Sequence, residues 1–310
     1  MDRGDPRERP ATGWVGGGSR TAAPLPGRPR GDGADRVSAV QRLIALDLDG
    51  TVLLEDETFS PGVVDAVAAA EHDGNIVTIA TGRGWDATAR ILHGLGIRPD
   101  YVVCSNGAAI MSRNDAVETG YERHATETFD PSEVLELLEK ELPDATYLVE
   151  LPDGSRLYTS FVDDWDLRDE DTRRVTLTEM RGREVARVVV VSADHTEEDF
   201  VRMVEEMGLN QVSYAVGWTA WLDIAPAGVN KSTALEQVRE LLGMPRESVV
   251  VIGDGRNDIG MFEWAAAGGG RAFAMGQAPD EVSQAATDIT DDVEDGGVAA
   301  ALEAIGVGAA

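Results

Sequence analysis

The sequence is poor in cysteine and histidine. Among its 310 residues it has one cysteine and four histidines. A single cysteine excludes an internal disulfide, and the apolar run YVVCSNG around Cys104 predicts a small, buried hydrophobic side chain. The histidines lie outside every motif described below, so we expect them to be surface or packing residues: they are His72, His93, His124 and His195.

Long apolar segments and basic charge are also scarce. No run of about 18 or more apolar residues occurs, and the start of the chain lacks the apolar segment of a secretion signal. We therefore expect a cytoplasmic protein with no membrane partner. The formal net charge is −29, which argues against a nucleic-acid partner, because binding a phosphate backbone needs a basic surface. Nothing in the composition indicates an oligomeric state.

Lysine is nearly absent. It occurs only at Lys140 and Lys231, and the other Lys or Arg positions are all arginine. Where arginine has otherwise been used, a lysine can be present for its compact ammonium group.

Strands and helices alternate along most of the chain. Residues 1–38 are rich in Pro, Gly and Arg, and we expect a disordered tail there. The later pattern predicts parallel strands with helical crossovers. The predicted elements are strand 42–47, helix 61–73, strand 75–80, helix 84–95, strand 100–104, a hairpin near AAIMSR, helix 231–242, strand 248–252, helix 257–267, and short pieces at RAFAM, DEVSQAA and TDIT.

A different pattern occupies residues 126–219. It predicts helices at DPSEVLELLEKEL and TEEDFVRMVEEM, and strands at ATYLVEL, SRLYTSFV, EVARVVVVS, QVSYAVG and TAWLDIA. Grouped strands with few helices indicate an inserted α+β domain of its own. The predicted fold class is therefore α/β: a Rossmann-like open parallel sheet, formed by residues 39–125 and 220–310, with an inserted α+β domain at 126–219.

Polar residues follow the predicted core strands where each one ends. Asp47 and Asp49 follow the first strand, and Lys231 opens a helix. Thr81, Gly82 and Arg83 follow the second strand, and Asp254, Asn257 and Asp258 follow the strand SVVVIG. Since ligands of open parallel sheets gather beyond the carboxyl ends of the strands, we expect these residues to form one site.

This set suits phosphoryl transfer. An aspartate attacks phosphorus when a divalent cation offsets the repulsion between the two anions, so we predict Asp47 as nucleophile and Mg²⁺ as cofactor. The expected metal ligands are Asp47, Asp254 and the backbone carbonyl of Asp49, with Asp258 behind them. Asp49 would act as general acid and base, and Thr81, Gly82, Lys231 and Asn257 would bind phosphate. Arg83 and Asn106 are candidates for substrate contact.

Together these motifs resemble the haloacid dehalogenase superfamily of phosphohydrolases, specifically its Cof-like subfamily IIB with a C2-type cap. The matching stretches are DLDGT at 47–51, TGR at 81–83, Lys231 in APAGVNKSTAL, GDGRNDIGMF at 253–262, SNGA at 105–108 and EDGGVAAAL at 294–302. The resemblance implies the same roles for Asp47, Asp49, Thr81, Lys231, Asp254 and Asp258, and a Mg²⁺-dependent phosphatase acting on a small phosphorylated metabolite, with a sugar phosphate favoured. Asn230 and Gln277 depart from the usual Ser and Asn.

Other interpretations remain open. Each motif alone could be structural: an acidic turn at DLDGT, a helix cap at Thr81 or an Asx turn at GDGRND. A calcium loop fits poorly, because the third acidic position and the distal Glu are missing. The functional alternatives are a phosphotransferase or phosphomutase of the same superfamily, and a receiver-like regulatory module phosphorylated on aspartate. The sequence does not predict which metabolite is the substrate.

Overall fold

The structure is a computed structural model that describes residues 41–160, 172–192, 202, 212–217 and 221–308. These residues all lie in one compact unit, residues 37–310. The predicted disordered tail, residues 1–38, and most of the predicted helix TEEDFVRMVEEM lie outside the described residues.

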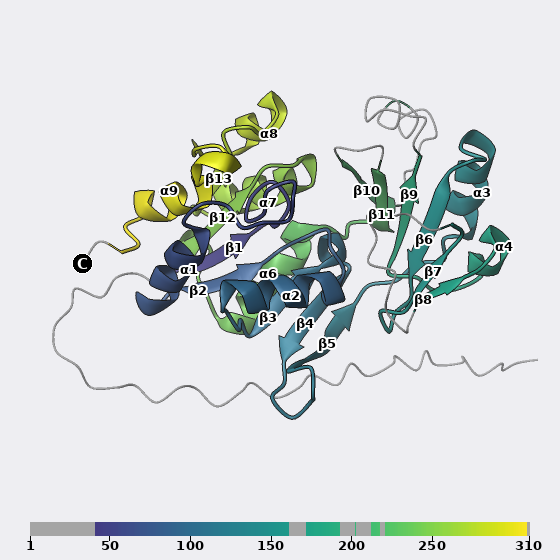
Figure 1. The fold of residues 1–310 in the computed structure, drawn as a ribbon, viewed down its shortest axis with the longest axis horizontal. Helices are drawn as coiled ribbons and strands as arrows, with labels where there is room; N and C mark the ends of the chain where they lie inside the picture. Colours follow the sequence, from purple (N-terminus) through teal and green to yellow (C-terminus); the bar gives the residue numbers. More distant parts are fainter. Residues whose placement is uncertain (1–40, 161–171, 193–201, 203–211, 218–220, 309–310) are drawn as a thin grey trace, which may run out of the picture. The chain divides into compact units, whose positions relative to one another are not determined.

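A five-stranded parallel sheet forms the core, in the order β14-β13-β12-β1-β2 (Figure 1). Its strands are β1 (Leu43–Leu46), β2 (Ile76–Ile79), β12 (Val249–Gly253), β13 (Arg271–Ala274) and β14 (Asp288–Ile289). All four residues of β1 are buried. A strand buried on both faces has a continuous apolar sequence such as LIAL, and this explains why the sequence predicted it well.

Helices cover both faces of this sheet. Ile44 and Leu46 of β1 pack with α1, α2 and α9, whereas Ala45 packs with α6 and α7, because successive side chains of a strand point to opposite faces. The helices are α1 (Val63–His72), α2 (Trp85–Leu95), α6 (Lys231–Leu242), α7 (Ile259–Ala267), α8 (Asp280–Ala285) and α9 (Gly297–Ala304), with short 3₁₀ turns η2 (Arg246–Ser248) and η4 (Val293–Asp295). The predicted α/β class with an open parallel sheet is confirmed.

A second sheet of three antiparallel strands continues from the core. It contains β3 (Tyr101–Cys104), β4 (Ala109–Arg113) and β5 (Tyr121–Thr126), with the 3₁₀ turn η1 (Ser105–Gly107) between the first two. A parallel bridge between Ala80 and Val103 connects it to the end of β2. The predicted hairpin is present, and Cys104 is buried as expected.

The inserted region forms a six-stranded sheet in the order β10-β11-β9-β6-β7-β8. Its strands are β6 (Thr146–Glu150), β7 (Arg156–Tyr158), β8 (Thr172–Arg174), β9 (Arg187–Val191), β10 (Val212–Gly217) and β11 (Trp221–Pro226). On one face Val149, Val188 and Leu222 pack into an apolar cluster with α3 (Ser132–Glu141) and α4 (Leu177–Met180). Figure 1 shows these two helices beside the sheet. The strand residues next to these, Glu150, Arg187 and Asp223, point to the other face.

Three elements of the structure were not predicted, and one predicted strand extends past the expected end of the insertion. Strand β8 and helices α4 and α9 were not predicted. Strand β11 pairs with β9 and β10 and ends at Pro226, beyond the residue 219 at which we expected the insertion to end. The division of the chain into core and cap domains stays a prediction. Among the described residues, no helix has the length and apolar composition needed to cross a membrane.

Candidate active site

The carboxyl ends of three parallel core strands bring the predicted site residues together. Asp47 follows β1, Thr81 follows β2, and Asp254 follows β12, which pairs directly with β1. Lys231 is the first residue of α6. All four side chains are buried, although three of them carry ionisable groups. Buried ionisable groups need partners, so their contacts indicate what this edge of the sheet is built to hold.

Three carboxylates and one ammonium form the centre of the site. Oxygen atoms of Asp47, Asp254 and Asp258 lie within 4.8 Å of one another. The Nζ of Lys231 donates to Asp47 Oδ1 at 2.5 Å and to Asp258 Oδ1 at 2.7 Å. The second oxygen of Asp258 accepts from the backbone N–H groups of Asp254 and Gly255, both at 3.0 Å. Asp258 therefore orients Lys231 and the loop that follows β12. Negative charge remains in excess around Asp47 and Asp254.

Asp254 carries an orphaned oxygen that fits a cation. Thr51 donates to its Oδ1 at 3.1 Å, but its Oδ2 is buried and has no hydrogen-bond partner among the described residues. The backbone of Gly50, with φ of 72°, passes so close that a Cβ there would lie 2.2 Å from this Oδ2. A buried carboxylate oxygen without a donor is costly unless a cation binds it. The donor set is oxygen only, as Mg²⁺ prefers.

Burial and mutual repulsion raise the pKa of two of these carboxyls. Burial raises the pKa of Asp47 to about 7, since the attraction of Lys231 only partly offsets burial and the repulsion of Asp258 and Asp49. Burial, followed by repulsion from Asp47 and Asp258, raises the pKa of Asp254 to about 8. Burial would lower the pKa of Lys231, but Asp258 and Asp47 outweigh it and raise that pKa above its ordinary value.

These pKa values predict a pH-dependent stabilisation by Mg²⁺. Without metal, stability should fall between the pKa of an unfolded aspartate, about 4, and about pH 8, the raised pKa of Asp254. In that range the folded protein binds more protons than the unfolded chain, so each rise in pH favours unfolding. Mg²⁺ would compete with those protons. We expect Mg²⁺ to raise the Tm more at pH 8 than at pH 5 in thermal melts against EDTA. Equal shifts at both pH values would contradict a metal site here.

Asp49 and Arg83 lie together, outside the carboxylate centre. Arg83 donates to Asp49 through Nε at 2.9 Å and Nη2 at 2.5 Å, and to Glu57 through Nη1 at 2.8 Å. The side chain of Asp49 is 55% exposed. Glu57 was not identified from the sequence, and its φ of 63° places it in an unusual left-handed conformation. The predicted acid–base residue thus faces the predicted substrate contact in this structure.

The loops beside the carboxylate centre carry Thr81, Asn106 and Asn257. The N–H of Arg83 donates to the Oγ1 of Thr81 at 3.1 Å, and Asn257 donates through Nδ2 to Asn106 Oδ1 at 3.0 Å. Gly107 approaches the start of α6 so closely that a Cβ would lie 2.2 Å from the carbonyl oxygen of Asn230. The loop 105–107 is therefore pressed against the helix that carries Lys231.

Both departures from the family pattern have structural roles. Asn230 caps α6, since its side chain accepts from the N–H of Thr233 at 3.1 Å. Gln277 donates through Nε2 to the carbonyl of Gly50 at 2.6 Å and accepts from the N–H of Val293 at 2.9 Å. Gln277 thereby holds the turn that follows Asp49.

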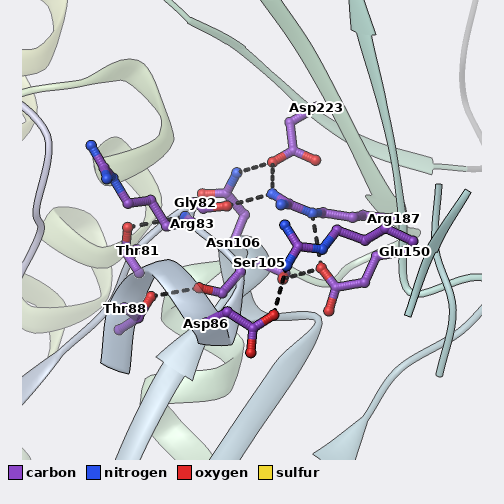
Figure 2. A network of polar contacts seen from close by, with 12 residues as sticks. Thr81, Gly82, Arg83, Asp86, Thr88, Ser105, Asn106, Glu150, Arg187 and Asp223 are labelled. Atoms are coloured by element: carbon purple, nitrogen blue, oxygen red, sulfur yellow. Dashed lines mark hydrogen bonds and ion pairs between the residues drawn. The ribbon is translucent and has the colours of Figure 1, made fainter. Parts of the chain in front are cut away.

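Sequence reasoning missed a group of charged residues on the six-stranded sheet. Glu150, Arg187 and Asp223 are buried and contact the loops that carry Gly82, Ser105 and Asn106 (Figure 2). A signal was present in the sequence: each is a charged residue within an otherwise apolar strand, as in EVARVVVVS and AWLDIA. That pattern does not predict which neighbouring strands these three residues would face.

Comparison with known proteins identifies a family. The model of the haloacid dehalogenase-like hydrolases matches residues 44–302. The chain is 30% identical over 273 residues to 5-amino-6-(5-phospho-D-ribitylamino)uracil phosphatase YitU of Bacillus subtilis, covering 84% of this chain and 96% of that protein. It is 29% identical over 275 residues to pyridoxal phosphate phosphatase YbhA of Escherichia coli, covering 81% of this chain and 93% of that protein.

A solved structure has the same fold. The HAD subclass IIB sugar phosphatase BT4131 superimposes with a TM-score of 0.70 at 21% sequence identity, covering 86% of this chain and 100% of that one. At this level of identity the similarity concerns the fold alone.

Proposed function

The chain belongs to the haloacid dehalogenase-like hydrolases and is a phosphatase of that superfamily, and from this premise we propose a Mg²⁺-dependent hydrolysis of a small phosphorylated metabolite through an aspartyl phosphate on Asp47. The observation that carries the proposal is the buried centre of Asp47, Asp254, Asp258 and Lys231, with the orphaned oxygen of Asp254. We also propose that the protein is located in the cytoplasm.

Asp47 would be the nucleophile of the first step. Lys231 holds its Oδ1, so we assign the attack on phosphorus to Oδ2. The new Oδ2–P bond forms as the ester P–O bond breaks, and a proton from Asp49 passes to the departing oxygen. Asp49 would then take a proton from the attacking water while the Oδ2–P bond breaks, which releases inorganic phosphate and restores Asp47.

Asp49 must leave Arg83 to perform this role. An arriving phosphate is an anion and would compete with the carboxylate of Asp49 for the guanidinium. Arg83 would then contact the substrate, and Asp49 would become available for proton transfer. Its exposed position allows this movement without disturbing the buried centre.

Asp47 and Asp254, with the backbone carbonyl of Asp49, are the groups that would hold Mg²⁺. When bound, the ion supplies positive charge that offsets the repulsion between the carboxylate and the phosphoryl oxygens. The other groups bind the phosphate: the hydroxyl of Thr81, the backbone of Gly82, the ammonium of Lys231 and the amide of Asn257, with Asn106 beside them.

The proposed substrates are small phosphate monoesters, with sugar phosphates favoured. The Bacillus subtilis relative acts on a phosphorylated ribitylaminouracil, and the Escherichia coli relative acts on pyridoxal phosphate. Both are small phosphate esters, and the first carries its phosphate on a sugar-derived chain. This chemistry supports a metabolite of the same size for this chain.

A screen of phosphorylated metabolites tests the proposal. Sugar phosphates, pyridoxal phosphate and nucleotides are incubated with the full chain in Mg²⁺ or in EDTA, and released phosphate is measured. We expect Mg²⁺-dependent release from at least one sugar or sugar-alcohol phosphate. Release that persists in EDTA would contradict the metal assignment, and a phosphorylated product in place of inorganic phosphate would identify a phosphotransferase. No release from any compound would contradict the proposed activity.

A further inference from the structure

We propose that Arg187, on the six-stranded sheet, is a positioning residue for phosphate binding that acts on Thr81 through the peptide group between Gly82 and Arg83. The inference rests on the proposed function, because it assumes that Thr81 binds phosphate. It assigns a role in the reaction to a residue of the inserted region that lies outside every sequence motif of the site.

Arg187 directly contacts the loop of residues 81–83, which we call the phosphate loop. Its Nη1 donates to the carbonyl oxygen of Gly82 at 2.5 Å and to Asp223 Oδ2 at 3.2 Å, and its Nε donates to Glu150 Oε2 at 3.2 Å (Figure 2). Arg187, Asp223 and Glu150 are each at most 6% exposed. In such a dry environment a guanidinium is held firmly, and its hydrogen bond to a carbonyl is stronger than on the surface.

The Gly82 carbonyl belongs to the same planar peptide group as the N–H of Arg83. That N–H donates to the Oγ1 of Thr81 at 3.1 Å. Arg187 therefore fixes the plane that fixes the Thr81 hydroxyl. Because Oγ1 accepts a hydrogen bond from Arg83, the hydroxyl proton can be donated to a phosphoryl oxygen. Each bond in this chain polarises the next, so Arg187 would also make Thr81 a better donor.

The core itself anchors the neighbouring carbonyls of this loop. The N–H of Asn106 donates to the carbonyl of Thr81 at 2.9 Å, and the N–H of Ser105 donates to the carbonyl of Arg83 at 2.9 Å. The carbonyl between them, that of Gly82, is bound by the inserted region through Arg187. The orientation of the central peptide group thus depends on a residue outside the core sheet.

A second contact connects the same arginine to the other side of the site. Asn106 donates through Nδ2 to Asp223 Oδ2 at 2.8 Å, and Asn257 donates to Asn106. Asp223 lies on β11, opposite Val189 of β9. Arg187 and Asp223 therefore act as one ion pair that contacts two loops of the proposed phosphate site. Arg187 contacts loop 81–83, and Asp223 contacts loop 105–107.

The geometry requires an arginine. A guanidinium presents Nε and Nη1 in a fixed planar fork and here serves Glu150, Asp223 and Gly82 at once. A lysine would keep the positive charge beside the two acidic residues, but its one nitrogen could not occupy the separate positions of Nε and Nη1 from which Arg187 donates. Arg187→Lys thus tests the position of the donor while limiting the cost of unpaired buried carboxylates.

The experiment compares Arg187→Lys with Arg156→Lys. Arg156, on β7, also bridges the inserted region to the core, since it pairs with Asp86 of α2 at 2.6 Å. Binding of inorganic phosphate with Mg²⁺ is measured by calorimetry, together with kcat and KM. We expect about tenfold weaker phosphate binding and a lower kcat for Arg187→Lys, and less than a twofold change for Arg156→Lys. Equal losses in both variants would overturn the proposal.

A double-mutant cycle with Thr81→Val tests the route of the effect. If Arg187 acts through the Thr81 hydroxyl, Arg187→Lys should weaken phosphate binding less than about threefold in the Thr81→Val background. A full tenfold loss in that background would overturn the proposal. Should Arg187→Lys fail to fold, Asp223→Asn serves in its place. It should weaken phosphate binding by about threefold by loosening Arg187, and unchanged binding would contradict the inference.

The proposed function and this inference fail in different ways. A wild-type chain that neither binds phosphate nor releases it from any substrate contradicts the proposed function. A wild-type chain that is active, with an Arg187→Lys variant that binds phosphate equally well, contradicts the positioning role alone.

Discussion

Replacing Asp47 by Asn is expected to lower kcat by roughly 10⁴-fold or more. The amide has nearly the same size and shape, but it cannot form the acyl phosphate on which the proposed reaction depends. The same change removes a buried carboxylate whose pKa is raised to about 7. We therefore expect the variant, at pH 8 in EDTA, to be at least as stable as the wild type. Phosphate release and thermal melts on the same preparation measure both effects.

An exposed aspartate provides the control for Asp47→Asn. Asp65 lies on the surface in the first turn of α1, so Asp65→Asn should leave kcat unchanged. Mass spectrometry of the variant excludes conversion of Asn back to Asp. More than a tenth of wild-type activity in a verified Asp47→Asn protein would refute the assignment of the nucleophile.

The core could be predicted because its signals are local. LIAL and VVVIG are short apolar runs, and the polar residues that follow each strand must meet wherever parallel strands end at the same edge. Helix α6 begins at the predicted residue, since Asn230 is a strong N-cap and Gly243 ends the helix in a left-handed conformation. These features depend on neighbouring residues in the sequence.

The features that were not predicted depend on pairing between residues that are far apart in the sequence. Strand β8 is three residues long, TRR, at the edge of its sheet, and has no apolar alternation that would mark it. The burial of Arg187 follows from its register opposite Glu150 in the β6–β9 pair. No local pattern sets that register. Likewise, the contact of Asp49 with Arg83 joins residues 34 positions apart through the fold of two loops.

Lys231 shows how composition can indicate a site. The chain has only one other lysine, and the ammonium of Lys231 lies between Asp47 Oδ1 and Asp258 Oδ1, with a side chain that is 1% exposed. A planar guanidinium is wider and would push these carboxylates apart. Lys231→Arg is therefore expected to keep the charge yet lose activity, because Asp47 would no longer be held in place.

Lys231→Met is expected to have the largest effect on stability. Removing the ammonium leaves Asp47 and Asp258 buried without their cation, which should lower the free energy of unfolding by about 3–5 kcal/mol at pH 8 in EDTA. The loss should be smaller at pH 5, because carboxyls without a cation take up protons more readily and the unpaired charge disappears. Turnover should fall below detection, since phosphate binding and the orientation of Asp47 are lost together. Urea titrations at both pH values measure the stability.

The only other lysine of the chain supplies the matched control. Lys140 is exposed on α3 and pairs with Glu136 one turn away at 3.2 Å. Lys140→Met should change the free energy of unfolding by less than about 0.5 kcal/mol, with no dependence on the pH interval studied. If the two variants were equally stable at pH 8, the centre could not contain the charged carboxylates on which the proposed cation site rests. The result would instead support the proposed site if the free energy of unfolding lost in Lys231→Met grows with pH and Mg²⁺ partly recovers it. The lysine, the carboxylates and the metal would then contribute to one electrostatic interaction.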